Sequence, residues 1–271
     1  MTEEVLMAPE IGAMEFSNKI AKNEKRGESV PPNTRRSTTP GFAATGCKPE
    51  EIQAPDTGID LWNDRQLLPN TRLYRVRKGY VVELYKIGEG KELMTHLFTP
   101  GDIVNGQALF FEDRLVSFAA AGTVELEIYD PDHIANSLLH SETCRNYLQR
   151  AEFARKTLID HAVLNLNCLS SSQRVAHFFC ELSTRLGIYG QARSITFTLP
   201  LMQRDLAGYL GNCAVHFNRV VRALRRENIM TWAGGRVVIS RWDDLARHGR
   251  FNPEYLRACC PDRPIRPRSA E

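Results

Sequence analysis

The segment 202–227, which reads MQRDLAGYLGNCAVHFNRVVRALRRE, constrains the fold of this chain more than any other stretch. Apolar residues recur there at helical spacing on both sides of Gly211, at the point where two helices would have to turn sharply. One face of the second helix is apolar at positions i, i+3, i+4 and i+7: Phe217, Val220, Val221 and Leu224. The pattern predicts a helix-turn-helix whose second helix buries this face.

The opposite face of the second helix carries side chains suited to DNA: Val215, Asn218, Arg219 and Arg222. Asparagine and arginine can form paired hydrogen bonds with the edges of adenine and guanine in the major groove. Arginines crowd the whole region, at positions 219, 222, 225, 226, 236 and 241. Such a run is equally typical of a solvated helix face, so it is the helix-turn-helix context that favours a DNA contact.

The bulk composition sets limits without identifying a function. The 271 residues suffice for two ordinary domains, and 42 % of them are hydrophobic. The formal net charge is only +3, which is too small to indicate nucleic-acid binding without the local pattern. The chain shows no nucleophile–base arrangement, no phosphate-binding glycine loop and no metal-ligand spacing, so we expect neither an enzyme nor a metal site.

The cysteines indicate a reducing compartment. They are dispersed, with no CxxC pair and no Cys/His cluster of zinc spacing: Cys47, Cys144, Cys168, Cys180, Cys213, Cys259 and Cys260. Cys168, Cys180 and Cys213 are expected to be buried as small hydrophobic residues. The sequence also lacks a signal peptide and an apolar run of roughly 18–20 residues that could span a membrane, which predicts a cytoplasmic protein without membrane contact.

Changes of pattern along the chain divide it into five segments. Residues 1–56 are rich in Pro, Ser, Thr and Gly and predict a disordered tail, which could still bind a partner. Short β-rich runs punctuated by glycine turns predict an antiparallel barrel or sandwich within 57–140. A long helix at 141–169 precedes a winged helix at 170–256 and a loose Pro/Arg-rich tail at 257–271.

Local signals place further elements inside these segments. In chain order they are a weak first strand at 57–70, a short helix from Pro131, a helix capped by the serine before Gln173 and ending near Gly187, a strand at 194–201, a hairpin around Gly234-Gly235, and a last helical turn at 242–249.

The long helix, expected over about 142–169, carries a narrow apolar stripe: Leu148, Ala151, Leu158, Ala162, Leu166 and Leu169. Its 3- and 4-residue steps are typical of a coiled-coil seam. The stripe could instead pack on the protein's own barrel. We favour a dimer seam because a single helix-turn-helix binds DNA weakly and usually works in pairs.

Over about residues 57–256 the chain resembles the Crp–Fnr superfamily of bacterial transcription regulators. The stretch VRKGYVVELYKIGEGKELMTHLFTPGDIV is similar to the cyclic-nucleotide-binding-type β-roll, with its glycine-punctuated strands and PGD turn. The helix of 142–169 resembles the dimer helix of the family. TLPLMQRDLAGYLGNCAVHFNRVVRALRRENIM resembles the winged helix-turn-helix, and VHFNR resembles a VHxNR motif found in one branch. The resemblance implies an α+β fold with a jelly-roll-like antiparallel β-roll, a long dimerisation helix and a C-terminal winged helix-turn-helix.

The resemblance also implies a role for individual residues in binding a palindromic operator. Arg219 matches the arginine that reads guanine, and Asn218 is a candidate for a second base contact. His216 is placed to reach phosphate, while Gln203 and Arg204 resemble phosphate clamps. The remaining residues of the expected DNA interface are Ala214, Val215 and Arg222.

Two features qualify these roles. Many relatives carry a glutamate that contacts cytosine where this chain has Val215, so the operator is expected to differ from the usual consensus. Arg222, like Arg225 and Arg226, is expected to face the DNA backbone or solvent rather than the bases.

The effector contacts of the cyclic-nucleotide-binding relatives are incomplete in this chain. Gly106 is kept, but the acid beside it is replaced by Gln107, and the expected arginine falls near Val116 or Ser117. A buried phosphodiester without a cation would be poorly paired, which disfavours cyclic nucleotides. Arg114 lies close in sequence and could supply the cation if the loop is short.

Two other sensory chemistries of the family are disfavoured as well. Iron–sulfur relatives cluster thiols near the N-terminus, where only Cys47 lies. Haem needs axial ligands, and His96, His133 and His140 are isolated histidines of the kind that are usually structural or exposed. We therefore expect no cofactor, and a β-roll that binds an unidentified ligand or serves as a scaffold.

Together these observations predict a dimeric, sequence-specific transcription regulator with double-stranded DNA, a second copy of itself and RNA polymerase as partners. The alternative is a ligand-sensing or protein-interaction module whose helix-turn-helix has degenerated. An enzyme is not expected.

Overall fold

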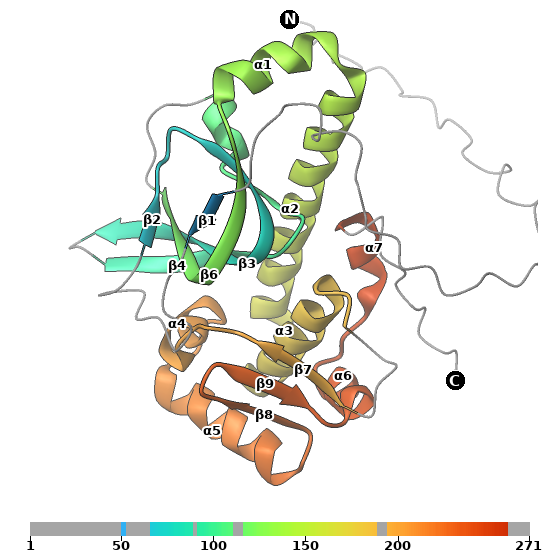
Figure 1. Cartoon of the computed structure of the whole chain (residues 1–271). Coiled ribbons are helices and arrows are strands. Elements are labelled where there is room, and N and C mark those ends of the chain that lie inside the picture. Colours follow the sequence, from blue (N-terminus) through green and yellow to red (C-terminus); the bar gives the residue numbers. More distant parts are fainter. Residues whose placement is uncertain (1–49, 53–65, 89–90, 111–115, 189–193, 260–271) are drawn as a thin grey trace, which may run out of the picture. The chain divides into compact units, whose positions relative to one another are not determined.

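The computed structural model describes residues 50–52, 66–88, 91–110, 116–188 and 194–259, which lie within one compact unit (Figure 1). The predicted tails fall almost entirely outside these residues.

The strands are β1 (Glu50–Ile52), β2 (Gln66–Leu68), β3 (Leu73–Gly88), β4 (Lys91–Phe98), β5 (Ile103–Val104), β6 (Val116–Tyr129), β7 (Ile195–Thr198), β8 (Met230–Ala233) and β9 (Arg236–Ile239). The α-helices are α1 (Pro131–His140), α2 (Glu142–Cys168), α3 (Ser171–Arg185), α4 (Gln203–Tyr209), α5 (Ala214–Arg226), α6 (Trp242–His248) and α7 (Leu256–Cys259).

An antiparallel sheet forms the N-terminal part, as predicted. Its strands follow the order β1-β6-β3-β4, with β2 paired to β6 and β5 paired to β3. The two long strands β3 and β6 run side by side from Leu73 opposite Tyr129 to Tyr85 opposite Val116. Only residues 66–68 of the weak first-strand candidate are described, and they form β2.

The long strand pair bends where its register shifts. The irregularities lie between Val76 and Tyr80, around Gly79, whose φ of 79° is in the left-handed region. A Cβ atom at Gly79 would clash with the carbonyl oxygen of Thr123 on β6. An extra residue in one strand increases bend and twist, so this bulge lets the sheet curve over an apolar interior.

The helical segments begin and end where their caps predict. The Asp130 side chain accepts the N–H groups of Asp132 and His133, so Pro131 starts α1. Ser141 caps α2, which spans the expected long helix. Ser170 and Gln173 form a reciprocal capping box at the start of α3, and Gly187 follows its end with φ of 72°.

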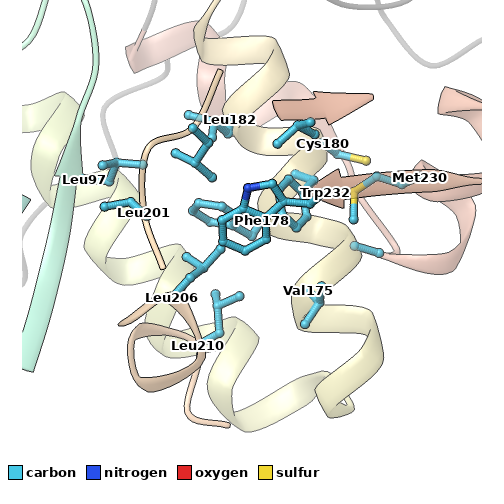
Figure 2. Packing of buried hydrophobic residues seen from close by; sticks show 14 of the residues in the cluster. Leu97, Val175, Phe178, Cys180, Leu182, Leu201, Leu206, Leu210, Met230 and Trp232 are labelled. Carbon is cyan, nitrogen blue, oxygen red and sulfur yellow. The ribbon is translucent and has the colours of Figure 1, made fainter. Parts of the chain in front are cut away.

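One apolar cluster joins the sheet to the helices that follow it (Figure 2). Val82, Met94 and Leu97 of the sheet belong to it, together with residues of α3 to α5 and the small sheet β7-β9-β8. Figure 2 shows Phe178, Leu182 and Leu206 converging with Trp232 in this cluster. Burial of this apolar area fixes the helix-turn-helix against α3.

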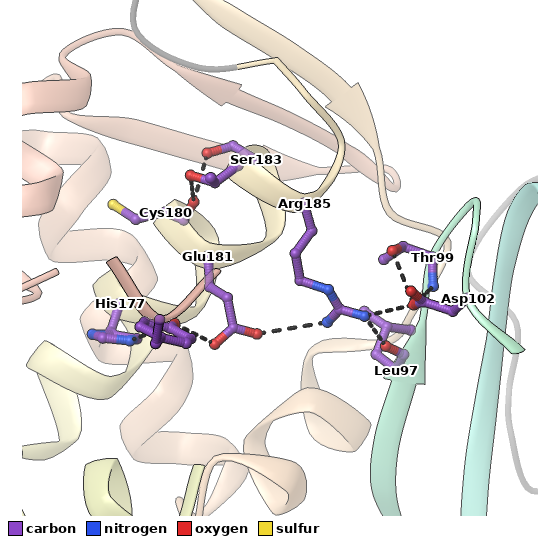
Figure 3. Close-up of polar contacts among 10 residues, drawn as sticks. Leu97, Thr99, Asp102, His177, Cys180, Glu181, Ser183 and Arg185 are labelled. Carbon is purple, nitrogen blue, oxygen red and sulfur yellow. Dashed lines mark hydrogen bonds and ion pairs between the residues drawn. The ribbon is translucent and has the colours of Figure 1, made fainter. Parts of the chain in front are cut away.

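Arg185, at the end of α3, adds polar bonds between the same parts (Figure 3). Its side chain is 3 % exposed, and Nη2 donates to the Leu97 carbonyl and to Asp102 Oδ2, each over 2.8 Å. Asp102 belongs to the PGD turn and also accepts the Thr99 N–H over 2.7 Å. A buried charge with several partners is stable only while all of them stay in place. The PGD turn is therefore fastened to α3.

Three sequence predictions were wrong in detail. Cys180 is buried, but Cys168 and Cys213 are exposed, because they lie at a helix end and before a helix start rather than on packed faces. Leu148 and Leu158 of the α2 stripe are buried within the chain, so at these positions the stripe packs on its own protomer. Residues 257–259, predicted to be loose, continue α7, which packs against α2.

The prediction of a disordered tail over 1–56 was also wrong at Glu50–Ile52, which form β1 and pair with β6. The last two predicted elements agree with the structure. The hairpin β8–β9 turns through Gly234 and Gly235, and α6 is the predicted last helical stretch. The fold is α+β, with an antiparallel N-terminal sheet, a long helix and a C-terminal winged helix-turn-helix. Among the residues that the structure describes, no helix combines the length and apolar content that membrane crossing requires.

Candidate nucleic-acid interface

The helix-turn-helix consists of α4 and α5, joined by residues 210–213. Gly211 has φ of 63°, and its N–H donates to the Gly208 carbonyl over 3.0 Å. The Asn212 N–H donates to the Ala207 carbonyl over 2.8 Å. This pair of bonds is a Schellman motif, which ends α4 and begins the turn. The turn predicted at Gly211 is confirmed.

The two faces of α5 differ as predicted. The apolar face is buried throughout: Phe217, Val220, Val221 and Leu224. On the opposite face Val215 is 72 % exposed, and Arg219 and Arg222 are exposed as well. Within the described part of the chain, neither arginine has a hydrogen bond or an ion pair with another residue. The helix thus holds its cationic face free while its apolar face anchors it.

The small sheet supports α5 from behind. Phe217 meets Trp232 of β8 edge to face, with ring centroids 6.0 Å apart at 83°. Trp232 in turn meets Phe179 of α3 at 5.7 Å. Aromatic pairs in this arrangement add about 0.5–1.5 kcal/mol beyond their buried area. The line of rings ties α5 to β8 and α3.

The start of α5 leaves backbone donors unsatisfied by side chains. Cys213 is the N-cap residue, and its side chain accepts no hydrogen bond from the helix. Ala214, the first residue of the helix, is exposed beside it. Free N–H groups and the positive end of the helix dipole make such a terminus suitable for a phosphate.

The other predicted DNA contacts lie on α4 and α5 but differ in availability. Asn218 Nδ2 donates to the Ala214 carbonyl over 3.1 Å, so a base contact requires this amide to leave its own helix. His216 is half-buried. At the start of α4, Arg204 is exposed, with Nε 3.8 Å from Asp205 Oδ1, and Gln203 is partly buried.

The arginines outside the recognition face divide into two kinds. Arg236 is exposed at the tip of the β8–β9 hairpin, and Arg225 and Arg226 occupy the last turn of α5. Arg241 instead donates through Nη2 to the Glu227 carbonyl over 2.6 Å, and its Nη1 lies 2.9 Å from Asp244 Oδ2. Arg241 therefore holds the end of α5, where helix carbonyls attract cations.

Sequence reasoning missed Arg174, which lies in the first turns of α3. Its guanidinium contacts the carbonyls of Leu210 and Gly211 in the helix-turn-helix turn. In the sequence, Arg174 stands out only as an arginine that follows the capping box. That position does not predict a contact with Leu210, which is 36 residues away.

The structure gives the surroundings of three of the four predicted effector residues. Gly106 starts a short 3-10 helix, Gly106–Leu109, beside Glu152 of α2, and Gln107 is exposed. Ser117 Oγ lies 3.5 Å from Glu92 Oε1, a carboxylate that is buried. Arg114 falls outside the described residues.

The three histidines considered as haem ligands differ in burial. His96 is buried, and burial together with Arg185 and Arg155 holds its pKa well below the usual value. His133 and His140 are exposed on α1. In the described ranges, His, Cys, Asp and Glu side chains form no cluster of three or more that could hold a metal ion.

Comparison with known proteins identifies the helix-turn-helix domain of the chain. Residues 173–248, from the start of α3 to the end of α6, match the family model of the Crp-like helix-turn-helix domain. The chain carries a Crp-like helix-turn-helix domain. With this domain and its curated relatives, the chain is of the Crp/Fnr type of transcription regulator.

Curated relatives of this Crp–Fnr protein are themselves regulators. It is 27 % identical to the regulatory protein HlyX of Actinobacillus pleuropneumoniae over 176 residues, which cover 64 % of this chain and 72 % of HlyX. It is 26 % identical to the anaerobic regulatory protein of Aggregatibacter actinomycetemcomitans over 190 residues, which cover 69 % of this chain and 72 % of the relative.

Solved structures show the same fold. FixK2 from Bradyrhizobium japonicum superposes with a TM-score of 0.60 at 17 % identity, covering 74 % of this chain and 96 % of FixK2. A CRP-family transcriptional regulator from Thermus thermophilus gives a TM-score of 0.57 at 17 % identity, with the same coverage of 74 % and 96 %. The Crp–Fnr fold therefore extends from the antiparallel sheet to the winged helix-turn-helix.

Proposed function

We propose that this Crp–Fnr protein is a sequence-specific DNA-binding regulator, which acts as a homodimer and reads a palindromic operator with α5. The observation that carries the proposal is the division of α5. Phe217 and the rest of its apolar face are buried, while Val215 and Arg219 stand exposed on the other side. A helix anchored in this way can enter a major groove without losing its packing. The regulatory names of the curated relatives support the same function.

Each exposed group of α5 has a chemical role in this proposal. Arg219 donates two hydrogen bonds to guanine O6 and N7, and Val215 contacts a thymine methyl group. Asn218 turns from the Ala214 carbonyl toward a second base. The uncapped N-terminus of α5, with His216, binds phosphate. Gln203, Arg204 and Arg222 set the register on the DNA backbone.

The proposal of a homodimer is supported by α2. Phe153 and Leu164 are 70 % and 53 % exposed, and they lie three helical turns apart on one face. Leu148 and Leu158, on the opposite face, are buried in the protomer. An exposed phenylalanine and leucine on one face of a long helix can be buried by packing against the same face of α2 in a second copy of the protein.

The sheet is proposed to act without a cyclic nucleotide. Ser117, near the expected position of the phosphate-binding arginine, lies against the Glu92 carboxylate, and a phosphate held there would meet a like charge. The sheet then binds a different ligand or serves as a scaffold, without haem or an iron–sulfur cluster. A cytoplasmic location and a contact with RNA polymerase complete the proposal, because a transcription regulator acts where the polymerase binds DNA.

The proposal is tested by selecting binding sites from a randomised DNA pool with the full-length protein. We expect a palindromic sequence to be enriched, and binding to weaken steeply with salt because phosphate contacts release counterions. Arg219→Ala should relax the preference at one base pair of each half-site, at a cost of about 1–3 kcal/mol. The matched control is Arg247→Ala, because Arg247 is exposed on α6, away from α5.

Two results would contradict the proposal in different ways. If no sequence is enriched, the helix-turn-helix is degenerate and the protein is a ligand-sensing or protein-interaction module. If a sequence is enriched but Arg219→Ala selects the same sequence with the same preference, the assignment of α5 as the reading helix is wrong.

A further inference from the structure

Arg174 connects the end of α2, the start of α3 and the turn of the helix-turn-helix, which lies 36 positions further along the chain. Its Nη1 donates to the Leu169 carbonyl over 2.8 Å, at the end of α2. Its Nε donates to the Leu210 carbonyl over 2.8 Å, and its Nη2 to the Gly211 carbonyl over 3.2 Å. One guanidinium on α3 thus bonds both the end of the long helix and the turn of the helix-turn-helix.

Two of the three carbonyls that Arg174 binds lie at helix ends, where carbonyls have no donor within their own helix. Leu169 is the C-cap residue of α2, and Leu210 is the C-cap residue of α4. The last carbonyls of a helix have no intrahelical donor and carry the negative end of the helix dipole. A cation that donates to them forms charge-assisted hydrogen bonds, which are about twice as strong as neutral ones.

Other contacts fix the same junction. Leu166, in the last turn of α2, lies so close to Gly211 that a Cβ atom there would be 2.8 Å from its Cδ2. Ser171, the first residue of α3, hydrogen-bonds through Oγ to Asn212 Oδ1, and Arg174 Nη2 lies 3.5 Å from the same atom. The turn before α5 is therefore held by both the end of α2 and the start of α3.

The geometry suits arginine alone among the cationic side chains. Three nitrogens of one planar group reach three carbonyls in two segments, whereas a lysine has a single nitrogen on a flexible stem. The position of the turn determines where α5 starts, because α5 begins at Ala214, only two residues after Asn212. Arg174 therefore controls where the reading face begins.

We propose that Arg174 is a positioning residue for DNA recognition, which locks the turn before α5 to the end of α2. The inference rests on the proposed function of α5. A change in the position of the end of α2 is then passed directly to the helix-turn-helix turn. Arg174 itself makes no contact with DNA in this proposal.

The test compares wild type, Arg174→Lys and Arg174→Met in full-length protein. Arg174→Lys keeps the charge, so a loss of binding cannot come from weaker attraction to phosphate. We expect both variants to remain folded by circular dichroism and to lose about ten-fold in preference for the selected operator over a scrambled duplex. Arg247→Met removes one exposed arginine on α6 and should keep the wild-type preference. Wild-type preference in both Arg174 variants would overturn the proposal.

A measurement without DNA separates this inference from the proposed function. Amide hydrogen exchange of residues 210–213 should be faster in Arg174→Lys than in wild type, because the carbonyl contacts of the turn are lost. If wild type selects no operator, the DNA-binding function fails, and unchanged exchange at the turn would then separately overturn the positioning role. If the Arg174 variants do not fold, Ser171→Ala decides: reduced operator preference supports the positioning role, and unchanged preference overturns it.

Discussion

At the scale of single residues, the arginines of the helix-turn-helix region have two distinct physical roles. Arg185 and Arg241 donate to backbone carbonyls and pair with carboxylates, so their charge is used inside the fold. Arg219 and Arg222 are exposed on α5 and have no partner among the described residues. Only the exposed arginines without partners can bind DNA in place of water without losing a contact that stabilises the fold. The cationic face of α5 is thus available for binding as it stands.

Two buried histidines predict a loss of stability in mild acid. Burial lowers the pKa of His177, whose ring nitrogens lie 3.1 Å from the Gly249 carbonyl and 3.2 Å from Tyr255 Oη, and burial lowers the pKa of His96 further. Both side chains stay neutral in the folded protein when they would be protonated in the unfolded chain. Below about pH 6.5 the unfolded chain therefore binds more protons, and the free energy of unfolding falls by up to about 1.4 kcal/mol per pH unit for each histidine.

Urea unfolding at pH 7.5, 6.5 and 5.5 measures this dependence. We expect similar stability at the two higher values and a clear decrease at pH 5.5, with a smaller decrease in His177→Gln. His133→Gln is the control, because His133 is exposed on α1. A stability that does not change between pH 7.5 and 5.5 would show that these histidines bind protons as readily in the folded protein as in the unfolded chain, which would contradict the lowered pKa.

At the scale of elements, α2 has two apolar faces with different uses. One face, with Leu148 and Leu158, packs within the protomer, and the other exposes Phe153 and Leu164. Sequence periodicity detected Leu148 and Leu158 and left two uses open for them, a dimer seam, which was favoured, and packing on the protein's own barrel. The exposed face is interrupted by the ion pair of Lys156 and Asp160 and was therefore less visible in the pattern. Burial, which sequence alone does not give, distinguishes the two.

The exposed face of α2 predicts the response of the assembly to substitution. Wild type should have the mass of a dimer by light scattering, and the double variant Phe153→Glu, Leu164→Glu should shift to the mass of a monomer, because four carboxylates would meet across the interface. Operator affinity should fall with it, since two half-sites are then no longer bound together. Leu139→Glu, on the exposed side of α1, should leave the mass unchanged. A double variant with the mass of a dimer would place the interface elsewhere.

Elements with strong local signals were predicted well from sequence. The capping box at Ser170, the turn at Gly211 and the Gly-Gly hairpin depend on residues within a few positions of one another, so their structure follows from local chemistry. The buried and exposed faces of α5 followed from helical spacing. The eight candidate DNA contacts are placed on α4 and α5, and their contacts with DNA stay a prediction.

What the sequence did not predict are contacts between distant positions. Arg174 meets Leu210, and Arg185 meets Leu97 and Asp102, across separations of 36 to 88 residues. No local pattern marks such partners, because an arginine on a helix has the same appearance whether it faces solvent or a helix end. Cys168 and Cys213 were misplaced for a similar reason, since their exposure depends on where each helix begins or ends.

At the scale of the whole described unit, the sheet and the helix-turn-helix share one apolar cluster rather than two separate cores. Tyr80 of β3 belongs to this cluster, and its hydroxyl donates to the Thr198 carbonyl of β7 over 2.8 Å. Arg185 adds charged bonds between α3 and the PGD turn. Packed and hydrogen-bonded side chains thus connect the sheet to α3, and Arg174 connects α3 to the turn before α5.

The claim that α5 reads bases is tested most directly by changing what it reads. Val215 is 72 % exposed, so Val215→Glu should leave the fold intact while replacing an apolar contact by a hydrogen-bond acceptor. Glutamate accepts a hydrogen bond from the amino group of cytosine. Binding-site selection with Val215→Glu should therefore yield a cytosine at one position of each half-site where wild type does not select it. An unchanged operator from a folded Val215→Glu protein would contradict the assignment of α5 as the recognition helix.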